Sequence, residues 1–207
     1  MFKQIEWLFF DVGTTLVDES KAEEHRIWDA IEGTDISYDQ VYTQAVQLAK
    51  QGDAESLKSV LKSLGLPITP WHHEDEVVYP HAVGCLARLH GKYKTGVIAN
   101  QSLGTADRMS QYGLSPYLDL VIASAEEGIA KPDLRIFELA LERANCLPEN
   151  AVMIGDRLDN DIIPAKRAGL KTILIRQGFG GMAAPLTEEK TPDCAVNNLR
   201  ELLELLV

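Results

Sequence analysis

Carboxylates gather after short apolar runs in this sequence. Asp11 follows one run, and Asp156, Asp159 and Asp161 stand together after another. The second group crowds like charges, which repel one another unless a cation is present. A single aspartate at a strand end is more often a turn or helix-cap residue, so Asp11 alone is a weak sign. The acidic turn is a stronger one, and it favours a bound cation.

Two further polar segments complete the set. Asn100 and Gln101 follow the apolar run Thr95–Ala99, and Lys131 begins a Lys-Pro-Asp segment that opens a helical pattern around Phe137. A lysine before a proline is usually solvated when it stands alone. The chain order, however, is strand-Asp, strand-Asn, Lys-Pro-Asp and then Gly-Asp with a further aspartate in the acidic turn. Chance is a poor explanation for that order.

Short apolar runs alternate with helical patterns, which is typical of repeated βα units and a parallel sheet. Glycine, proline, asparagine or aspartate flanks each run, as expected for strands that are covered on both faces. The carboxyl ends of such strands form the edge at which open α/β sheets bind ligands, and all four polar segments are predicted to lie there. The predicted strands are Ile5–Phe10, Thr95–Ala99, Leu118–Ala123, Ala151–Ile154 and Thr172–Ile175.

The stretch from about Val17 to Asp75 breaks this alternation, because it carries only helical pattern. We expect this block to form a cap over the sheet edge, with hinges near Val17–Glu19 and Val77–Pro80. The predicted organisation is a core of residues 1–16 and 79–207 and a helical cap of residues 17–78. The predicted cap helices are Ala22–Ile31, Tyr38–Lys50 and Ala54–Leu64.

The bulk composition narrows the class of partner. The 207 residues carry a formal net charge of -11. Such a field opposes nonspecific binding to nucleic acid or to anionic membranes, but it leaves room for a small anionic substrate at a local positive site. No targeting segment or membrane span is visible, so we expect a cytoplasmic protein. The sequence gives no sign of its oligomeric state.

Taken together, the motifs make the sequence similar to the haloacid dehalogenase superfamily over essentially the whole chain. The likeness includes Val78-Tyr79-Pro80 before the second core segment and Ala168-Gly169 after the acidic turn. It implies an α/β fold in which a Rossmann-like parallel-sheet core carries a small all-helical cap inserted after the first strand. It also implies a Mg²⁺-dependent hydrolase, with a phosphatase acting on a small phosphorylated metabolite as the leading interpretation.

The resemblance assigns roles residue by residue. Asp11 is similar to the nucleophile that forms an aspartyl-phosphate, and Lys131 to the residue that neutralises charge between nucleophile and phosphoryl group. The implied Mg²⁺ ligands are Asp11, Asp156, Asp161 and the backbone carbonyl of Gly13. Asn100 is implied as a catalytic residue, and the implied substrate-binding residues are Thr14, Thr15, Asn100, Gln101 and Arg157.

Two residues depart from the family pattern at the reaction centre. Most phosphatases of the superfamily carry a second aspartate two residues after the nucleophile, as acid and then base, where this chain has Gly13. Positioned acid–base catalysis is worth roughly 10²–10⁴-fold. Ala99 also replaces the usual serine or threonine of the second motif. We therefore expect a bias toward aryl or acyl phosphates, whose leaving groups need little proton donation.

Two alternatives stay open at this point. A pseudo-enzyme that binds Mg²⁺ and a phosphorylated ligand would explain Gly13 and Ala99, although it has little need for an intact nucleophile. Hydrolysis of a carbon–halogen or carbon–phosphorus bond is the other. Dehalogenation is disfavoured because those enzymes use no metal, and phosphonate cleavage needs a cap lysine that nothing in the sequence singles out.

Several cap residues have simpler interpretations. Trp28 and Tyr42 are expected in the core of the cap, and His25 and Arg26 are expected to face solvent rather than to select a substrate. Segment 71–76 contains two histidines and three acidic residues. It lacks the fixed spacing of a known metal site, so a solvated connector is expected there.

Overall fold

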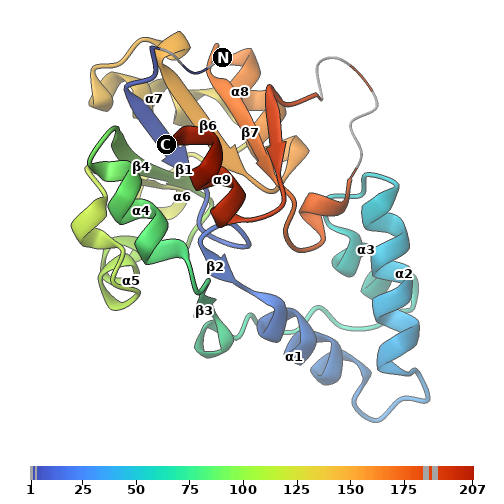
Figure 1. Ribbon diagram of the computed structural model, residues 1–207. Coiled ribbons are helices and arrows are strands. Elements are labelled where there is room, and N and C mark those ends of the chain that lie inside the picture. Colours follow the sequence, from blue (N-terminus) through green and yellow to red (C-terminus); the bar gives the residue numbers. More distant parts are fainter. Residues whose placement is uncertain (1, 3, 184–186, 188–190) are drawn as a thin grey trace.

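The computed structural model describes residues 2, 4–183, 187 and 191–207, and its centre is a parallel sheet of six strands (Figure 1). The spatial order is β5-β4-β1-β6-β7-β8, with every neighbouring pair parallel. This arrangement confirms the predicted fold class, a Rossmann-like α/β sheet. The strands are β1 Trp7–Phe10, β4 Lys94–Ala99, β5 Leu120–Ala123, β6 Ala151–Gly155, β7 Lys171–Ile175 and β8 Cys194–Val196.

β1 shows why the sheet needs a layer on each face. All four of its residues are buried. Leu8 and Phe10 pack into one apolar cluster, and Trp7 and Phe9 pack into another. Because strand side chains alternate between faces, a strand without polar residues is stable only when both faces are covered.

Helices supply those two layers. The helices α4 Ala82–His90 and α9 Leu199–Leu206 share the cluster of Leu8, whereas α7 Leu134–Ala144 and α8 Ile163–Arg167 share the cluster of Phe9. Two shorter helices, α5 Thr105–Gln111 and α6 Ser124–Glu127, contact β5. Among the helices within the described ranges, none is both long and apolar enough to cross a membrane. Single turns lie at η1 His73–Asp75, η2 Ser115–Tyr117, η3 Pro148–Asn150, η4 Leu158–Ile162 (a π turn) and η5 Gly180–Met182.

Residues 17–78, here called the cap segment, begin and end in a two-stranded antiparallel ribbon. The ribbon joins β2 Val17–Asp18 to β3 Val77–Val78, which are the two places where hinges are predicted. Three helices lie between these strands and stand apart from the sheet in Figure 1. They are α1 Ser20–Ile31, α2 Tyr38–Lys50 and α3 Ser56–Ser63.

The helices of the cap segment enclose a small apolar core of their own. Ile27, Val41, Ala45 and Leu61 are completely buried there. Phe179, which follows β7 in the sequence, packs into the same cluster. A loop of the core therefore completes the apolar interior of the cap segment.

Some expectations need correction. Trp28 and Tyr42 are 52% and 40% exposed, and they stack on either side of Tyr38 instead of entering the cap core. Apolar pattern does not distinguish an aromatic residue in a core from one in a surface stack. The sequence also places the starts of β1 and β5 two residues too early, and it misses β8, whose three residues are too few to form a recognisable pattern.

Packing between α7 and the sheet can be tested at Phe137, which is completely buried. Phe137→Ala is expected to lower the free energy of unfolding by about 3–5 kcal/mol, because lost burial and the cavity add together. Glu138→Ala, an exposed neighbour on the same helix, should change it by no more than about 0.5 kcal/mol. Urea unfolding measures both, and equal losses in the two variants would contradict the assignment of Phe137 to the core.

Candidate active site

The predicted acidic site forms at the carboxyl edge of the sheet. Asp11 follows β1 and Asp156 follows β6, the strand that pairs with β1, so their side chains meet at adjacent strand ends. Asp161 joins them from the π turn η4. Carboxylate oxygens of these three residues lie within 4.8 Å of one another.

Lys131 lies inside this cluster. Its Nζ is 2.9 Å from Oδ1 of Asp11 and 2.6 Å from Oδ1 of Asp161, and its side chain is 1% exposed. Burial opposes the charged form, but the charges of Asp11 and Asp161 prevail and raise the pKa of Lys131 above its usual value. The lysine therefore remains a cation in the buried site.

One ammonium group does not balance three carboxylates. Burial comes first, and the charges of Asp161 and Asp11 add to it, in raising the pKa of Asp156 well above that of an ordinary carboxyl. Burial also raises the pKa of Asp161, against the opposing effect of Lys131. A bound cation would relieve this repulsion. Oxygen donors of this kind fit Mg²⁺, which prefers carboxylates and water.

Gly155 gives Asp161 the space that it occupies. A Cβ placed on Gly155 would overlap the carboxyl of Asp161 and lie 2.6 Å from its Cβ. The backbone N–H of Arg157 donates a hydrogen bond to Oδ2 of Asp161 at 3.0 Å. Gly155 therefore ends β6 directly before Asp156, and its missing side chain also leaves room for Asp161.

Asn100 acts on Lys131 rather than on the cluster directly. Its Nδ2 donates to the carbonyl of Lys131, and its Oδ1 accepts from the backbone N–H of Lys131, both at 2.8 Å. These two bonds fix the backbone that carries the lysine. By these contacts Asn100 positions Lys131, and the catalytic role implied for it remains a prediction.

The turn after β1 places Thr14 and Thr15 differently. Thr14 has a φ of 56°, which is uncommon for a residue other than glycine, and it lines the cleft described below. Thr15 is completely buried and does not line that cleft. The structure thus brings Thr14 to the predicted site but leaves Thr15 beneath the surface.

Glu19 is a site residue that the sequence analysis missed, since it was considered only as part of a hinge. Oγ1 of Thr14 donates a hydrogen bond to its Oε2 at 3.1 Å. Burial raises the pKa of Glu19 to about 8, with further contributions from the charges of Asp11 and Glu76. No motif marks this residue, because its position depends on how the chain turns between β2 and α1.

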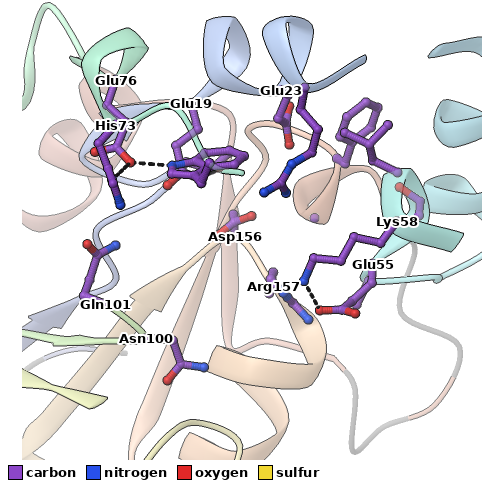
Figure 2. A pocket seen from close by; sticks show the side chains of 18 of the residues that line it. Glu19, Glu23, Glu55, Lys58, His73, Glu76, Asn100, Gln101, Asp156 and Arg157 are labelled. Carbon is purple, nitrogen blue, oxygen red and sulfur yellow. Dashed lines mark hydrogen bonds and ion pairs between the residues drawn. The ribbon is translucent and has the colours of Figure 1, made fainter. Parts of the chain in front are cut away.

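A cleft of about 390 Å³ leads to the acidic site from between the cap segment and the sheet edge (Figure 2). Figure 2 shows Asn100, Gln101, Asp156 and Arg157 on the core side of this cavity and Glu19 on the other. A smaller adjoining cleft of about 140 Å³ reaches Asp11, Gly13 and Lys131. The residues that line the larger cleft from the cap segment include Glu19, Glu23, Arg26, Ser56, Lys58, Trp71, His73 and Glu76.

The structure corrects two expectations about the cap segment, one for Arg26 and one for segment 71–76. Arg26, expected to face solvent, lines the cleft, and its guanidinium carbon lies 4.7 Å from the ring centre of Trp71. Segment 71–76 is not a purely solvated connector, because the side chain of Glu76 is only 4% exposed. It accepts hydrogen bonds from Trp71 at 2.7 Å and from Tyr112 at 2.7 Å.

Gln101 and Arg157, both predicted to bind substrate, are at the cleft and already have partners there. Arg157 pairs with Asp159 through two hydrogen bonds of 3.0 and 2.7 Å. Gln101 accepts a hydrogen bond of 3.1 Å from Arg108. Their positions agree with the prediction, and a role in binding remains a prediction.

The family model for haloacid dehalogenase-like hydrolases matches residues 5–169, which include Asp11, Lys131, Asp156 and Asp161. The chain belongs to this family. The similarity recognised from the four motifs is thereby confirmed, and the protein is a hydrolase of the haloacid dehalogenase type.

Curated relatives of this hydrolase match it almost end to end. The glyceraldehyde 3-phosphate phosphatase of Pyrococcus furiosus is 31% identical, over 99% of this chain and 94% of its own. The enzyme of the same name from Methanopyrus kandleri is 28% identical, over 98% of this chain and 97% of its own.

Solved structures share the fold of the hydrolase. YfnB of Bacillus subtilis, solved bound to magnesium, has a TM-score of 0.71 at 21% identity and covers 99% of both chains. A dehalogenase solved as an intermediate complex has a TM-score of 0.72 at 20% identity, covering 100% of this chain and 99% of its own. Identities this low bear on the fold alone.

The packing of Asp161 against Gly155 yields a test of the metal site. Gly155→Ala is expected to displace Asp161 and to weaken Mg²⁺ affinity by roughly 10–100-fold, as losses of supporting contacts around metals do. Affinity is measured from the rise of the thermal unfolding midpoint during a Mg²⁺ titration. Gly84→Ala is the matched control, since a Cβ there meets no atom within 4 Å. An unchanged Mg²⁺ response in Gly155→Ala would argue against a metal held by Asp161.

Proposed function

We propose that this hydrolase is a Mg²⁺-dependent phosphatase that acts on a small phosphorylated metabolite through an aspartyl-phosphate at Asp11. The observation that carries the proposal is the contact of Lys131 with Asp11 beside the buried carboxylates of Asp156 and Asp161. In this proposal Asp11 is the nucleophile, Lys131 is a fixed cation, and the carboxylates are the oxygen donors for a metal, all in one site. The relatives named as glyceraldehyde 3-phosphate phosphatases support the same reaction class.

The chain's own residues divide the chemistry among them. A carboxylate oxygen of Asp11 attacks phosphorus, and water later hydrolyses the aspartyl-phosphate. Lys131 reduces the repulsion between Asp11 and the phosphoryl oxygens. Asp11, Asp156, Asp161 and the carbonyl of Gly13 would hold Mg²⁺, which when bound neutralises charge on the transferring phosphoryl group.

The cleft supports a small anionic substrate. Its volume of about 390 Å³ lies at the lower end of the range for ligand pockets. Nε of Arg26 is buried and has no hydrogen-bond partner within the described part of the chain. Arg26 itself lines the cleft, so its positive charge can pair with an anionic group of the substrate, and we assign Arg26 to substrate binding.

Cleavage of a carbon–phosphorus bond is the second candidate, and Lys58 is the observation in its favour. Lys58 lines the cleft, as a Schiff-base lysine would have to do. Its Nζ, however, pairs with Oε1 of Glu55 at 2.8 Å, whereas a Schiff base forms from a neutral amine. Borohydride trapping with a phosphonoaldehyde tests this reading, and covalent labelling at Lys58 would favour it over the phosphatase.

Asp11 provides the direct test of the proposed reaction. Asp11→Asn is expected to lower Mg²⁺-dependent release of p-nitrophenol from p-nitrophenyl phosphate by more than about 10³-fold, because the nucleophile is lost. Asp35→Asn removes the same charge from an exposed position and should retain wild-type turnover. Wild-type protein that binds phosphate compounds without Asp11-dependent turnover would point instead to a binding pseudo-enzyme.

Arg26 provides a test of the substrate site. Arg26→Ala is expected to raise KM for an anionic phosphate ester by roughly tenfold, because a hydrogen bond to a charged group is lost. The value of kcat should change little, since binding of this kind is uniform along the reaction. Lys50→Ala removes an exposed cation from the end of α2 and serves as the control. A fall in kcat at constant KM would refute a binding role for Arg26.

A further inference from the structure

The missing acid–base aspartate at position 13 has a counterpart in space. A Cβ placed on Gly13 would lie 2.7 Å from Cδ of Glu19 and 2.8 Å from its Oε2. The carboxyl of Glu19 therefore fills the volume that an aspartate side chain at position 13 would need. Gly13 is the residue that leaves this volume free.

Glu19 reaches that position from the other side of the turn. It directly precedes α1, and its side chain makes no capping hydrogen bond to that helix. Oγ1 of Thr14 instead holds its Oε2 at 3.1 Å. Within the described residues Thr14 is the hydrogen-bond partner of this carboxyl, so Oε1 is available to a reactant in the cleft.

Thr14 and Gly13 act as a pair. Thr14 adopts a left-handed backbone with a φ of 56°, a conformation that is unfavourable for a residue with a Cβ. The carbonyl of Thr14 is fixed in that turn by a hydrogen bond from Nε2 of Gln177 at 3.0 Å. The turn thus provides both the space for the Glu19 carboxyl and the hydroxyl that orients it.

Glu19 also lies where a proton-transfer group is needed. It lines both the substrate cleft and the smaller cleft that contains Asp11, Gly13 and Lys131. Figure 2 shows Glu19 entering the cavity opposite Asp156. The neighbouring carboxylate of Glu76 is already held by Trp71, His73 and Tyr112, so it is fixed away from this task.

We propose that Glu19 is the proton-transfer residue of this active site, a role that rests on the proposed phosphatase function. As an oxygen of Asp11 bonds to phosphorus, the P–O bond to the leaving group breaks and its electron pair goes to the leaving oxygen. The protonated carboxyl of Glu19 gives its proton to that oxygen. In the second step Glu19 takes a proton from water as the water oxygen attacks phosphorus, and Asp11 leaves as a carboxylate with release of phosphate.

The leaving group separates this role from a structural one. Glu19→Gln keeps the size of the side chain and removes its proton transfer, so kcat on glycerol 3-phosphate should fall by roughly 10²–10⁴-fold. With p-nitrophenyl phosphate the first step needs little acid, whereas water attack still needs the base. Glu19→Gln should therefore give a burst of about one p-nitrophenol per active site, followed by slow turnover. Glu32→Gln, an exposed residue after α1, is the control.

Moving the carboxyl provides a gain of function. Gly13→Asp alone would push the carboxyl of Glu19 out of this volume and put another carboxyl in its place, so it should not increase turnover. The double variant Gly13→Asp/Glu19→Ala returns a carboxyl to the same volume and should exceed Glu19→Ala by more than tenfold on glycerol 3-phosphate. The Mg²⁺ concentration for half-maximal rate should stay constant in the Glu19 variants.

Three results would overturn the assignment. The first is a wild-type kcat of Glu19→Gln on glycerol 3-phosphate. The second is an equal loss of turnover by Glu19→Gln on aryl and alkyl phosphates, without a burst. The third is a raised Mg²⁺ requirement of the Glu19 variants, which would make Glu19 a metal ligand. Absence of Asp11-dependent turnover in the wild type on every phosphate would refute the proposed function itself. The two failures are therefore distinct.

Discussion

Crowding of negative charge at the carboxyl edge of the sheet is the constraint on which this structure depends. Asp11, Asp156 and Asp161 meet within 4.8 Å, and one buried lysine lies among them. Such an arrangement is costly without further positive charge, because burial and mutual repulsion both oppose ionised carboxylates. The parallel sheet, the Gly155 contact and the Asn100–Lys131 bonds hold these groups together against that repulsion.

The same constraint explains the division of labour between the sheet and the cap segment. The sheet edge supplies fixed charges on strand ends, where backbone pairing leaves little freedom of movement. The cap segment supplies the walls of the cleft, including Arg26 and Glu19, and connects to the sheet through only two short strands. Phe179 follows β7 in the core and packs into the apolar interior of the cap segment, so packing as well as the chain connection joins the cap segment to the core.

The turn after β1 shows how a departure from a family pattern can be compensated at a distance in sequence. Glycine at position 13 would by itself remove the carboxyl that serves proton transfer. In space, however, the carboxyl of Glu19 occupies the volume beside Gly13, and the hydroxyl of Thr14 holds it there. Gly13, Thr14 and Glu19 are then parts of one arrangement.

The sequence by itself determined the order of the motifs along the chain, the parallel sheet, and the meeting of Asp11, Lys131, Asp156 and Asp161. Apolar periodicity and strand-end residues are local signals, and parallel strands bring their ends to one edge whatever the loops do. Only the tertiary structure decided that Glu19 faces Gly13, that Asn100 holds a lysine backbone, and that Trp28 and Tyr42 stay exposed. These features depend on contacts between segments far apart in the chain or on the path of a turn, and no local pattern of residue types encodes either one.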